Sequence, residues 1–440
     1  METSTEGPPD EAAGPPSEEP IGGHLLPSTA STGADGGLTV GGCSLVELAE
    51  TYGTPLFVYD EAHLRARAAE ARAAFDDGVA YASKAFLCKA MAGLAAEAGL
   101  AVDVATGGEA AVALAGGARR LVFHGNNKST DELRLALELA EATVVVDAFD
   151  EIDRLARLVG DGRTAPLRVL LRVNPGVEAH THAHVMTGQE DSKFGFSLAS
   201  GAAEAAADRL AGLDGVELAG VHAHVGSQIF GLEAFELEVA RLVPLVDRFG
   251  LSELCVGGGL GVAYLNGESA PTITEWAAGL RSACRAAGLP SGVRLTAEPG
   301  RAIVATAGCT LYRVGTIKAL PGIRTYVSVD GGMSDNPRPV LYGSGYEAFL
   351  PRAPGAARPL AARVVGKHCE SGDVLVAEAR LPEDLAVGDV LATPVTGAYG
   401  FAMASNYNRL PRPPVVFVAG GAARVVVRRE TVDDLLRLEP

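Results

Sequence analysis

Short apolar runs alternate with longer stretches of mixed polarity from residue 55 to about residue 305. The runs are rich in valine, alanine and leucine, which is typical of strands covered on both faces. In the longer stretches apolar residues recur every three or four positions, and this period predicts amphipathic helices. Such regular alternation indicates parallel β/α units.

Eight strands can be counted in this region. Helices are predicted between them, for example over residues 85–98, 108–116, 130–141 and 233–249. Eight strands with helical crossovers predict an α/β fold in which residues 55–305 form a (β/α)₈ TIM-type barrel. The predicted strands are VAYAS from residue 79, LAVDV from 100, RLVFH from 120, TVVVD from 143, RVLLRVN from 168, LAGVHAHV from 218, ELCVG from 253 and RLTAEP from 294.

The pattern changes after residue 305, where strand-like runs follow one another with few helical signals between them. Four clear runs are TYVSVDGG from residue 325, ARVVGKHC from 362, DVLVAEA from 373 and VVFVAG from 415. They predict an antiparallel β domain over residues 306–440. We expect the segment 36–54 to join this domain from the amino-terminal side.

Charge and composition restrict the function. The chain has 440 residues, 48% of them hydrophobic, and its 37 basic and 54 acidic residues give a net charge of -17. This acidic balance argues against a nucleic-acid partner. No run of about 18 apolar residues is present, so no membrane span is predicted.

The first residues, METSTEGPPDEAAGPPSEEP, lack the basic and apolar regions of a signal peptide. Their acidic, proline-rich composition predicts a disordered leader over residues 1–35. The six cysteines are scattered without CxxC pairs, which favours reduced thiols. Together these features indicate a cytoplasmic protein.

Polar residues and glycines follow the predicted strands, at the end of a barrel where active sites lie. Lys84, after the first strand, stands among Tyr81, Ala82, Ala85 and Phe86. Apolar surroundings would desolvate the amine and prepare it for a Schiff base. A surface lysine at the start of a helix explains the same hexapeptide.

The glycine run GGGLG, residues 257–261, follows the seventh strand. Glycines let backbone N–H groups approach an anion, and barrel enzymes often bind phosphate after strands seven and eight. A tight turn between strand and helix is the alternative explanation.

Glu298 ends the eighth strand in EPGR, where a buried carboxylate needs a cationic partner. The protonated ring nitrogen of pyridoxal phosphate is one candidate, because a paired ring withdraws electrons strongly. Neighbouring Arg301 is the other. His224 in HAHVGS is suited to stacking on a flat ring and Ser227 to binding a phosphate oxygen, although a hydrogen-bonded core histidine fits the same pattern.

Alternating histidines suggest a second class of function. HTHAH at residues 180–184 and HAH at 222–224 place imidazoles on one face of a strand, as in a metal-dependent barrel hydrolase. The first cluster follows NPG in a loop, and no carboxylate stands nearby at a ligand spacing. This hypothesis is therefore the weaker one.

Taken together, the motifs resemble those of the barrel-fold, alanine racemase-like pyridoxal phosphate decarboxylases, specifically the diaminopimelate decarboxylases. The resemblance covers residues 36 to about 415. In chain order the motifs are YASKAF, DVATGGE, FHGNNKS, RVNPGVEAHTH, TGQEDSKFGF, HAHVGSQ, GGGLG, EPGR, DGGMSDNPRP, LYG, CESGD, GAYG and SNYN.

The resemblance implies a role for each site residue. Lys84 would carry the cofactor as a Schiff base, and Glu298 would pair with its ring nitrogen. Cys369 would help to return a proton, and Glu370 would bind the distal amino group of the substrate, both entering from the other subunit of a homodimer. The remaining residues would hold the cofactor (His224, Ser227, Gly258, Gly259 and Tyr399) or the substrate carboxylate (Arg301, Arg338 and Tyr342), with Tyr399 near both.

The implied reaction is decarboxylation of meso-2,6-diaminopimelate to L-lysine and carbon dioxide, the last step of lysine biosynthesis. A decarboxylase of lysine or ornithine would share Lys84, His224 and Glu298 but would not need cations for a second carboxylate. A racemase of related fold would place arginine where Glu298 stands. A non-catalytic cofactor-binding protein would lack the substrate residues, such as Arg338 and Glu370.

Overall fold

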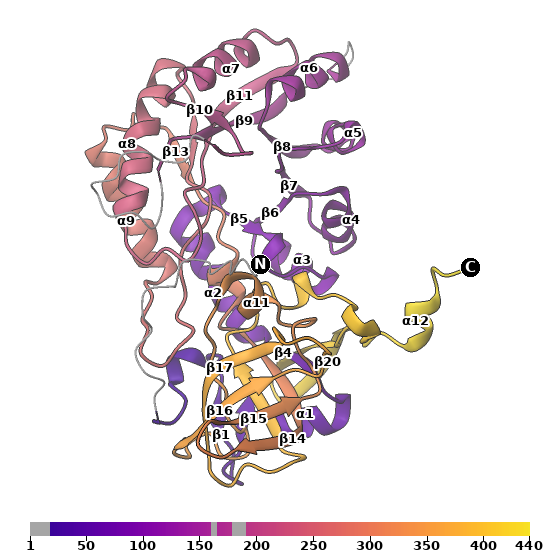
Figure 1. Cartoon of the computed structure of the whole chain (residues 1–440). Helices are drawn as coiled ribbons and strands as arrows, with labels where there is room; N and C mark the ends of the chain where they lie inside the picture. The colour runs from indigo at the N-terminus through magenta and orange to yellow at the C-terminus, as the bar shows by residue number, and fades with distance from the viewer. Residues whose placement is uncertain (1–17, 160–164, 178–190) are drawn as a thin grey trace, which may run out of the picture. The chain divides into compact units, whose positions relative to one another are not determined.

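Eight parallel strands form a barrel in the computed structural model, which describes residues 18–159, 165–177 and 191–440 (Figure 1). A bridge between Val79 and Ala297 joins the first strand to the last. Each strand overlaps a predicted one, so the barrel is confirmed. In hydrogen-bonding order the strands are β13 (Arg294–Thr296), β12 (Glu253–Cys255), β11 (Val216–His222), β9 (Leu167–Asn174), β8 (Glu141–Val146), β7 (Arg120–Phe123), β6 (Ala101–Val104) and β5 (Ala80–Ala82).

Helices lie on the outside of these strands (Figure 1). Side chains cap several of them: Thr106 caps α4, and Ser129 and Thr272 form capping boxes at α5 and α9. Each cap satisfies a backbone N–H that the helix leaves free, so the helix starts directly after the preceding loop. The helices are α2 (Glu61–Phe75), α3 (Lys89–Glu97), α4 (Gly107–Ala115), α5 (Thr130–Glu138), α6 (Phe149–Leu158), α7 (Ala202–Ala211), α8 (Glu233–Arg248), α9 (Ile273–Ala286) and α10 (Arg301–Val304).

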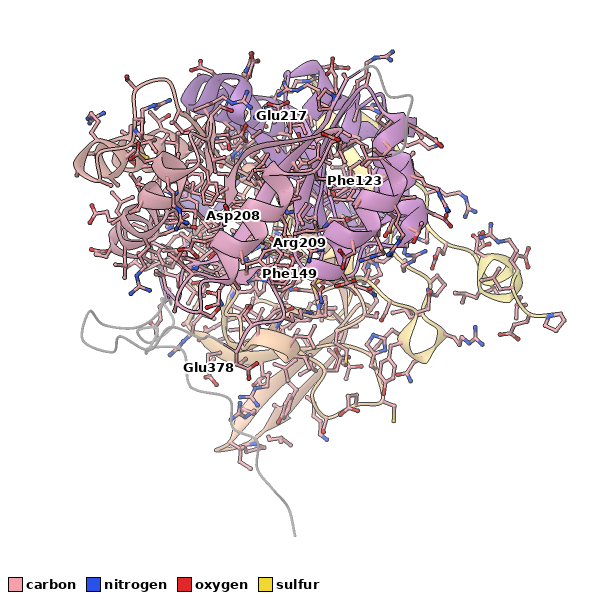
Figure 2. The ribbon with its side chains drawn as sticks, turned by 90° about the horizontal axis from the view of Figure 1, so that it is seen from above. Phe123, Phe149, Asp208, Arg209, Glu217 and Glu378 are labelled. Atoms are coloured by element: carbon pink, nitrogen blue, oxygen red, sulfur yellow. The ribbon has the colours of Figure 1, made fainter. Side chains whose placement is uncertain are left out.

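Aromatic and apolar contacts hold the barrel layers together. Val145, Leu170, Ala219 and Cys255 form a buried cluster inside the strands. Outside, Phe149 at the start of α6 lies near Arg209 of α7, whose guanidinium is 5.7 Å from the centre of the ring (Figure 2). This contact joins helix α6 to helix α7 on the outside of the barrel.

The rest of the chain builds an eight-stranded sheet. Its order is β17-β16-β15-β14-β4-β19-β20, with β18 paired to β14. Most neighbours are antiparallel, as predicted, while β15 with β16 and β4 with β19 run parallel, so the sheet is mixed. The strands are β4 (Leu56–Asp60), β14 (Gly308–Leu320), β15 (Arg324–Val329), β16 (Leu360–Val365), β17 (Val374–Leu381), β18 (Val390–Pro394), β19 (Val415–Ala419) and β20 (Ala422–Val427).

Strand β4 corrects the predicted domain boundary at residue 55. Leu56–Asp60 was predicted to belong to the barrel, yet this strand pairs with β14 and β19. All five of its residues are buried, and a strand buried on both faces has the same sequence pattern in either sheet.

The prediction of a disordered leader is wrong for residues 18–35. Arg358 donates hydrogen bonds to the carbonyl oxygens of Glu18 and Glu19, and Leu25 is buried. Residues 18–35 are therefore ordered, and the first 17 lie outside the described residues. The segment continues through the small sheet of β1 (Ser31–Thr32), β2 (Leu38–Val40) and β3 (Cys43–Ser44) into helix α1 (Leu45–Tyr52).

The chain divides into two compact units. We call residues 66–262 with 270–303 the barrel unit, and residues up to 65 with 263–269 and 304–440 the sheet unit. The sheet unit also carries the short helices α11 (Arg338–Tyr342) and α12 (Val432–Leu436). None of the described helices has the length and apolar character that crossing a membrane requires.

Candidate active site

Two imidazoles hold the carboxylate of Glu298, which follows β13 in the barrel unit. Nε2 of His124 lies 2.9 Å from Oε1, and Nε2 of His222 lies 3.0 Å from Oε2. The three side chains come from the ends of β7, β11 and β13 and are nearly inaccessible to solvent. Each carboxylate oxygen therefore has a partner, which fixes the plane of the group.

The same contacts decide the protonation of these groups. Burial alone would raise the pKa of Glu298, but His124 and His222 outweigh it and hold that pKa well below the usual value. Burial would lower the pKa of His124, yet the charges of Asp103 and Glu298 raise it above 6.5. Burial lowers the pKa of His222 to about 4. At neutral pH Glu298 is thus an anion beside one neutral histidine and one that favours its charged form.

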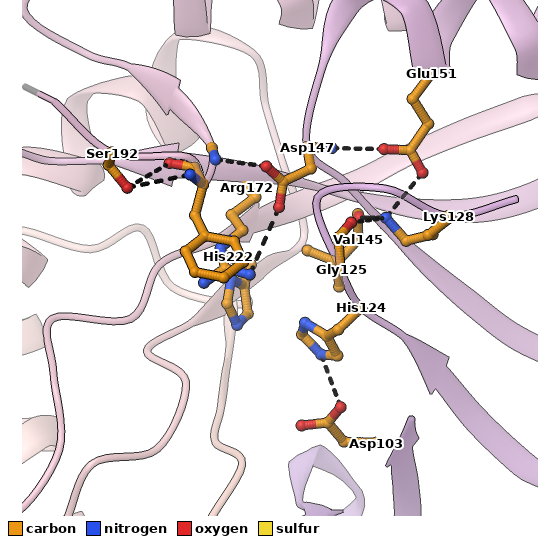
Figure 3. A network of polar contacts seen from close by, with 12 residues as sticks. Asp103, His124, Gly125, Lys128, Val145, Asp147, Glu151, Arg172, Ser192 and His222 are labelled. Carbon is orange, nitrogen blue, oxygen red and sulfur yellow. Dashed lines mark hydrogen bonds and ion pairs between the residues drawn. The ribbon is translucent and has the colours of Figure 1, made fainter. Parts of the chain in front are cut away.

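Asp103 adds a second carboxylate. Asp103 lies on strand β6, and its Oδ1 is 3.6 Å from Nε2 of His124 (Figure 3). Burial, reinforced by the charge of Glu298, raises the pKa of Asp103 to about 6. The group can therefore balance the charge of His124 close to neutral pH.

His224 lies two residues beyond His222 and is partly exposed. The backbone N–H of Gly258 donates to its Nδ1 at 3.3 Å, so the ring carries its proton on Nε2. Burial, together with the positive charge of Lys84, lowers the pKa of His224 to about 3. His224 is thus a neutral, oriented ring, suited to stacking on an aromatic cofactor.

The predicted glycine loop follows β12, and its glycines pack closely against neighbouring backbone. A Cβ on Gly258 would lie 2.5 Å from the carbonyl oxygen of Glu298, and one on Gly259 would lie 2.6 Å from that of Gly226. Gly259 also has a φ of 110°, which other residues rarely adopt. Only glycine fits here, as expected for a backbone that must approach an anionic group closely.

Ser227 and Arg301 meet at the same end of the barrel. The guanidinium of Arg301, at the start of α10, donates to Oγ of Ser227 at 2.9 Å. Arg301 does not form an ion pair with Glu298 in the described structure, where the two histidines occupy that carboxylate instead. The simple salt bridge considered for Glu298 is therefore wrong.

Lys84 lies in a turn of 3₁₀ helix, Ser83–Ala85, directly after β5. Its neighbours Ser83 and Ala85 are buried, but Lys84 itself is exposed. The expected desolvation of its amine is thus not found, because the turn carries the side chain beyond the end of the strand. Its position at the carboxyl end of β5 is the predicted one.

A buried ion-pair network supports this end of the barrel (Figure 3). Nζ of Lys128 lies 2.8 Å from Oε1 of Glu151 and donates to the carbonyl oxygens of Gly125 and Val145. Oε2 of Glu151 accepts the N–H of Asp147 at 2.9 Å. The loop after His124 is thereby tied to the ends of β8 and α6.

Asp147 extends the network to Arg172. Its Oδ2 lies 3.5 Å from the guanidinium of Arg172, which also lies 4.2 Å from the ring centre of Phe194. Arg172 comes from strand β9 and lowers the pKa of His224, which places its charge near the site. Asp103, His124 and Arg172 were given no individual role from the sequence, and His222 was considered only as a possible metal ligand, although all four lie in barrel strands or directly after one.

In the sheet unit Arg338 is buried among tyrosines. It donates to Oη of Tyr346 at 2.5 Å, and its guanidinium lies 4.4 Å from the ring centre of Tyr264. Tyr399 is near enough to contribute to the raised pKa of Arg338. Tyr342, at the far end of the same short helix, is exposed. Arg338 is therefore a rigid cation, while Tyr342 faces solvent.

Cys369 and Glu370 lie together in the turn between β16 and β17, and both are exposed. Oε1 of Glu370 accepts hydrogen bonds from Oγ of Ser371 and from the N–H of Gly372, each at 3.3 Å. These contacts fold the carboxylate over its own turn. The structure thus presents a thiol and a carboxylate side by side on the sheet unit.

The two histidine clusters considered as metal sites, at residues 180–184 and 222–224, must be judged separately. Residues 180–184 lie outside the described residues. Ligand atoms of His124, His222 and Glu298 lie within 4.8 Å of one another, a set that could hold a metal ion. The choice between a metal and a cofactor at this carboxylate is decided by comparison with known proteins.

Residues 61–305 match the family described as pyridoxal-dependent decarboxylase, pyridoxal binding domain. Diaminopimelate decarboxylase of Mycobacterium tuberculosis is 46% identical over 94% of this chain and 98% of its own. The enzyme of that name from Bacillus subtilis is 45% identical over the same shares. The chain belongs to the diaminopimelate decarboxylase family.

Solved structures of the family agree. Diaminopimelate decarboxylase from M. jannaschii, solved in complex with L-lysine, superposes with a TM-score of 0.86, at 31% identity over 94% of this chain and 98% of that one. Lysine/ornithine decarboxylase from Vibrio vulnificus, 23% identical with a TM-score of 0.70, shares the fold. The cofactor of this decarboxylase is pyridoxal phosphate.

The barrel unit fits that cofactor. Glu298 is an ionised carboxylate suited to a protonated ring nitrogen, and His224 is a neutral ring suited to stacking. The loop at Gly258 and Gly259 leaves backbone exposed where any Cβ would collide. The family match and this fit favour a cofactor over a metal ion at His124, His222 and Glu298, and the metal-dependent hydrolase hypothesis is set aside.

Proposed function

We propose that this chain decarboxylates meso-2,6-diaminopimelate to L-lysine and carbon dioxide. The observation that carries the proposal is the carboxylate of Glu298, held ionised between His124 and His222. Pyridoxal phosphate, when bound, supplies an aromatic ring that accepts the electrons left by departing carbon dioxide. A ring nitrogen paired with an anion makes the ring a stronger acceptor, which favours decarboxylation.

Residues of the barrel unit would each hold one part of the cofactor. Lys84, at the end of β5, is proposed as the lysine that bonds to it covalently. His224 would stack on the ring, and the backbone at Gly258 and Gly259 with Ser227 would bind the phosphate. The bond between Arg301 and Ser227 supports this assignment, because it keeps a cation next to the proposed phosphate site.

The sheet unit would select the substrate. Arg338, buried and fixed by Tyr346, is proposed to bind the carboxylate at the far end, together with Arg301 and Tyr342. Glu370 would bind the distal ammonium group, and Tyr399 would contact both cofactor and substrate. Selection follows because lysine and ornithine have no second carboxylate, so these cations would lose their partner.

Cys369 is proposed to return a proton to the carbon that loses carbon dioxide. Its thiol is exposed, next to the carboxylate proposed to grip the substrate. We further propose a homodimer in which Cys369 and Glu370 of one copy serve the site of the other. The apolar side chains exposed on α11, Val340 at 40%, Leu341 at 57% and Tyr342 at 62%, support a subunit interface beside Arg338.

We also propose that the enzyme works in the reducing cytoplasm. None of the six cysteines, which all lie among the described residues, forms a disulfide, and four of them are buried. Reduced thiols are the ordinary state of cysteine in that compartment.

Carbon dioxide release from meso-diaminopimelate, lysine and ornithine, measured side by side, tests the proposal. We expect release from diaminopimelate, and Arg338→Lys should lower its advantage over lysine by roughly 10- to 150-fold, the value of one hydrogen bond to a charged group. Arg352→Lys, a surface arginine paired with Asp384 and Asp389, is the matched control and should leave the ratio unchanged. Equal rates on the three substrates would refute the roles given to Arg301 and Arg338.

A further inference from the structure

The segment SNYN, residues 405–408, has no role in the function proposed so far, yet it lies against the turn that carries Cys369. Oδ1 of Asn408 accepts the backbone N–H of Cys369 at 3.1 Å. The same oxygen lies 3.3 Å from Nδ1 of His368. One amide oxygen thus joins two consecutive residues of the turn.

The hydrogen bond from Cys369 determines which atom of the Asn408 amide group faces the turn. A backbone N–H can only donate, so the atom of Asn408 that faces it is the oxygen. That oxygen in turn requires a donor from His368, which places a proton on Nδ1. Nε2 is then free to accept the hydroxyl of Ser334, which lies 2.8 Å away. Neutral His368 satisfies both contacts and bridges Asn408 to Ser334.

The base of the turn is fixed separately by Asp373. Its carboxylate accepts the N–H groups of Met333 at 2.6 Å and His368 at 2.8 Å. A Cβ added to Gly332 or Gly366 would lie within 2.6 Å of that carboxylate, so the backbone packs directly on it. Asp373 therefore anchors the stem of the turn, whereas Asn408 reaches the backbone of Cys369 itself.

The backbone of Asn408 suits this task. Its φ of 50° and ψ of 26° lie in the left-handed region, which asparagine, aspartate and glycine adopt more readily than other residues. The ring of Tyr407 lies 5.3 Å from that of His368 and holds the segment beside the turn. The left-handed residue thereby turns its amide toward Cys369.

We infer that Asn408 and His368 are positioning residues for Cys369, holding its thiol and the adjoining Glu370 in the geometry needed for proton return and substrate binding. The contacts between these residues all lie within the sheet unit and involve side chains that the cofactor and substrate are not proposed to touch. The role rests on the proposed function of Cys369, but the contact with Asn408 can be tested independently of it.

The test compares Asn408→Gly with Asn408→Asp in the holoenzyme. Glycine keeps the left-handed backbone without strain and removes the acceptor, whereas aspartate keeps both. We expect amide hydrogen exchange in the peptide containing Cys369 to be roughly 2- to 10-fold faster in Asn408→Gly, the value of one hydrogen bond. Exchange should return to the wild-type rate in Asn408→Asp.

Turnover supplies the second readout. A displaced proton donor should lower kcat in Asn408→Gly by roughly 10- to 100-fold while the cofactor absorbance stays as in the wild type. Unchanged exchange at Cys369, or faster exchange with unchanged kcat, would overturn the inference. Faster exchange throughout the chain would also overturn it, since the role would then be general stability.

Two variants of His368 separate its contacts. The amide nitrogen of His368→Asn takes the place of Nδ1 and keeps the bond to Asn408, while His368→Gln reproduces Nε2 and keeps the contact with Ser334. We expect His368→Asn to retain more kcat than His368→Gln, and the reverse order would contradict the path through Asn408. If Cys369→Ala keeps full turnover, the proposed proton donor is wrong, whereas the exchange experiment still reports on the Asn408 contact.

Discussion

Nε2 of His124 lies 2.9 Å from Oε1 of Glu298, joining two strands of the barrel whose residues are 174 positions apart in the chain. The contact is buried, and it pairs the imidazole with the carboxylate that is proposed to bind the cofactor ring. A side chain that stabilises the charged form of another group in this way should change how the free energy of unfolding depends on pH.

We expect His124 to make the free energy of unfolding of the apoenzyme fall as the pH rises. The pKa of His124 is raised in the folded state, so the folded protein binds more protons, and the stabilisation present below its ordinary value of 6.5 disappears as the group titrates. Asp103, with a pKa raised to about 6, acts in the same direction. Urea unfolding between about pH 6 and about pH 9 should show a steeper decline for the wild type than for His124→Gln.

His24→Gln is the control for this measurement, because His24 is an exposed histidine outside the barrel unit. The free energy of unfolding of His24→Gln should decline with pH at the same slope as that of the wild type. Parallel slopes for the wild type and His124→Gln would mean that His124 does not carry the charge assigned to it.

Lys84 should be the point of covalent attachment of the cofactor. Purified enzyme is expected to absorb visible light, and borohydride should bleach this absorbance and leave the cofactor fixed to the peptide containing Lys84, as read by mass spectrometry. In Lys84→Ala the absorbance should be absent and turnover lower by roughly 10²- to 10⁴-fold. Lys89→Ala removes an exposed lysine only five positions further along and should behave as the wild type. A colourless wild-type protein would contradict the cofactor assignment.

The ion pair of Lys128 and Glu151 should be costly to break from one side. Their side chains are 1% and 3% exposed, so Lys128→Met leaves an unpaired buried carboxylate and should cost about 3 to 5 kcal/mol in the free energy of unfolding. Replacing both residues by methionine should cost less than the sum of the two single changes. Arg134→Met, in an exposed pair with Asp131, should cost less than about 1 kcal/mol. Additive effects of the two buried changes would contradict the pairing.

Glu238, in helix α8, should destabilise the protein at neutral pH. The residue is fully buried, neither carboxylate oxygen has a hydrogen bond in the described structure, and burial raises its pKa well above the usual value. Glu238→Met should therefore raise the free energy of unfolding at about pH 7 by roughly 1 to 3 kcal/mol.

The gain from Glu238→Met should shrink as the pH falls toward about 4.5, because the carboxyl group then becomes neutral in the unfolded chain as well. Urea unfolding at both pH values measures this difference. A loss of stability in Glu238→Met at pH 7 would show that the carboxylate has a favourable partner.

The barrel and its active end could be predicted from the sequence because short apolar runs and helical periods are local properties of the chain. Lys84, Gly258 and Glu298 could be located in the same way, since each follows a recognisable strand. Strand β4 could not be assigned correctly, because a strand buried on both faces has the same pattern in either sheet. The ordered structure of residues 18–35 could not be predicted either, because it depends on Arg358, which lies more than 300 residues away along the chain.

The sequence by itself determined the eight-stranded barrel, the family motifs and the residues after each strand. Only the tertiary structure decided that His124 and His222 share the carboxylate of Glu298, that Lys84 is exposed, and that Asn408 reaches the backbone of Cys369. The physical reason is that hydrophobic periodicity specifies which face of an element is buried, whereas the partner and charge of a polar group depend on atoms brought together by folding.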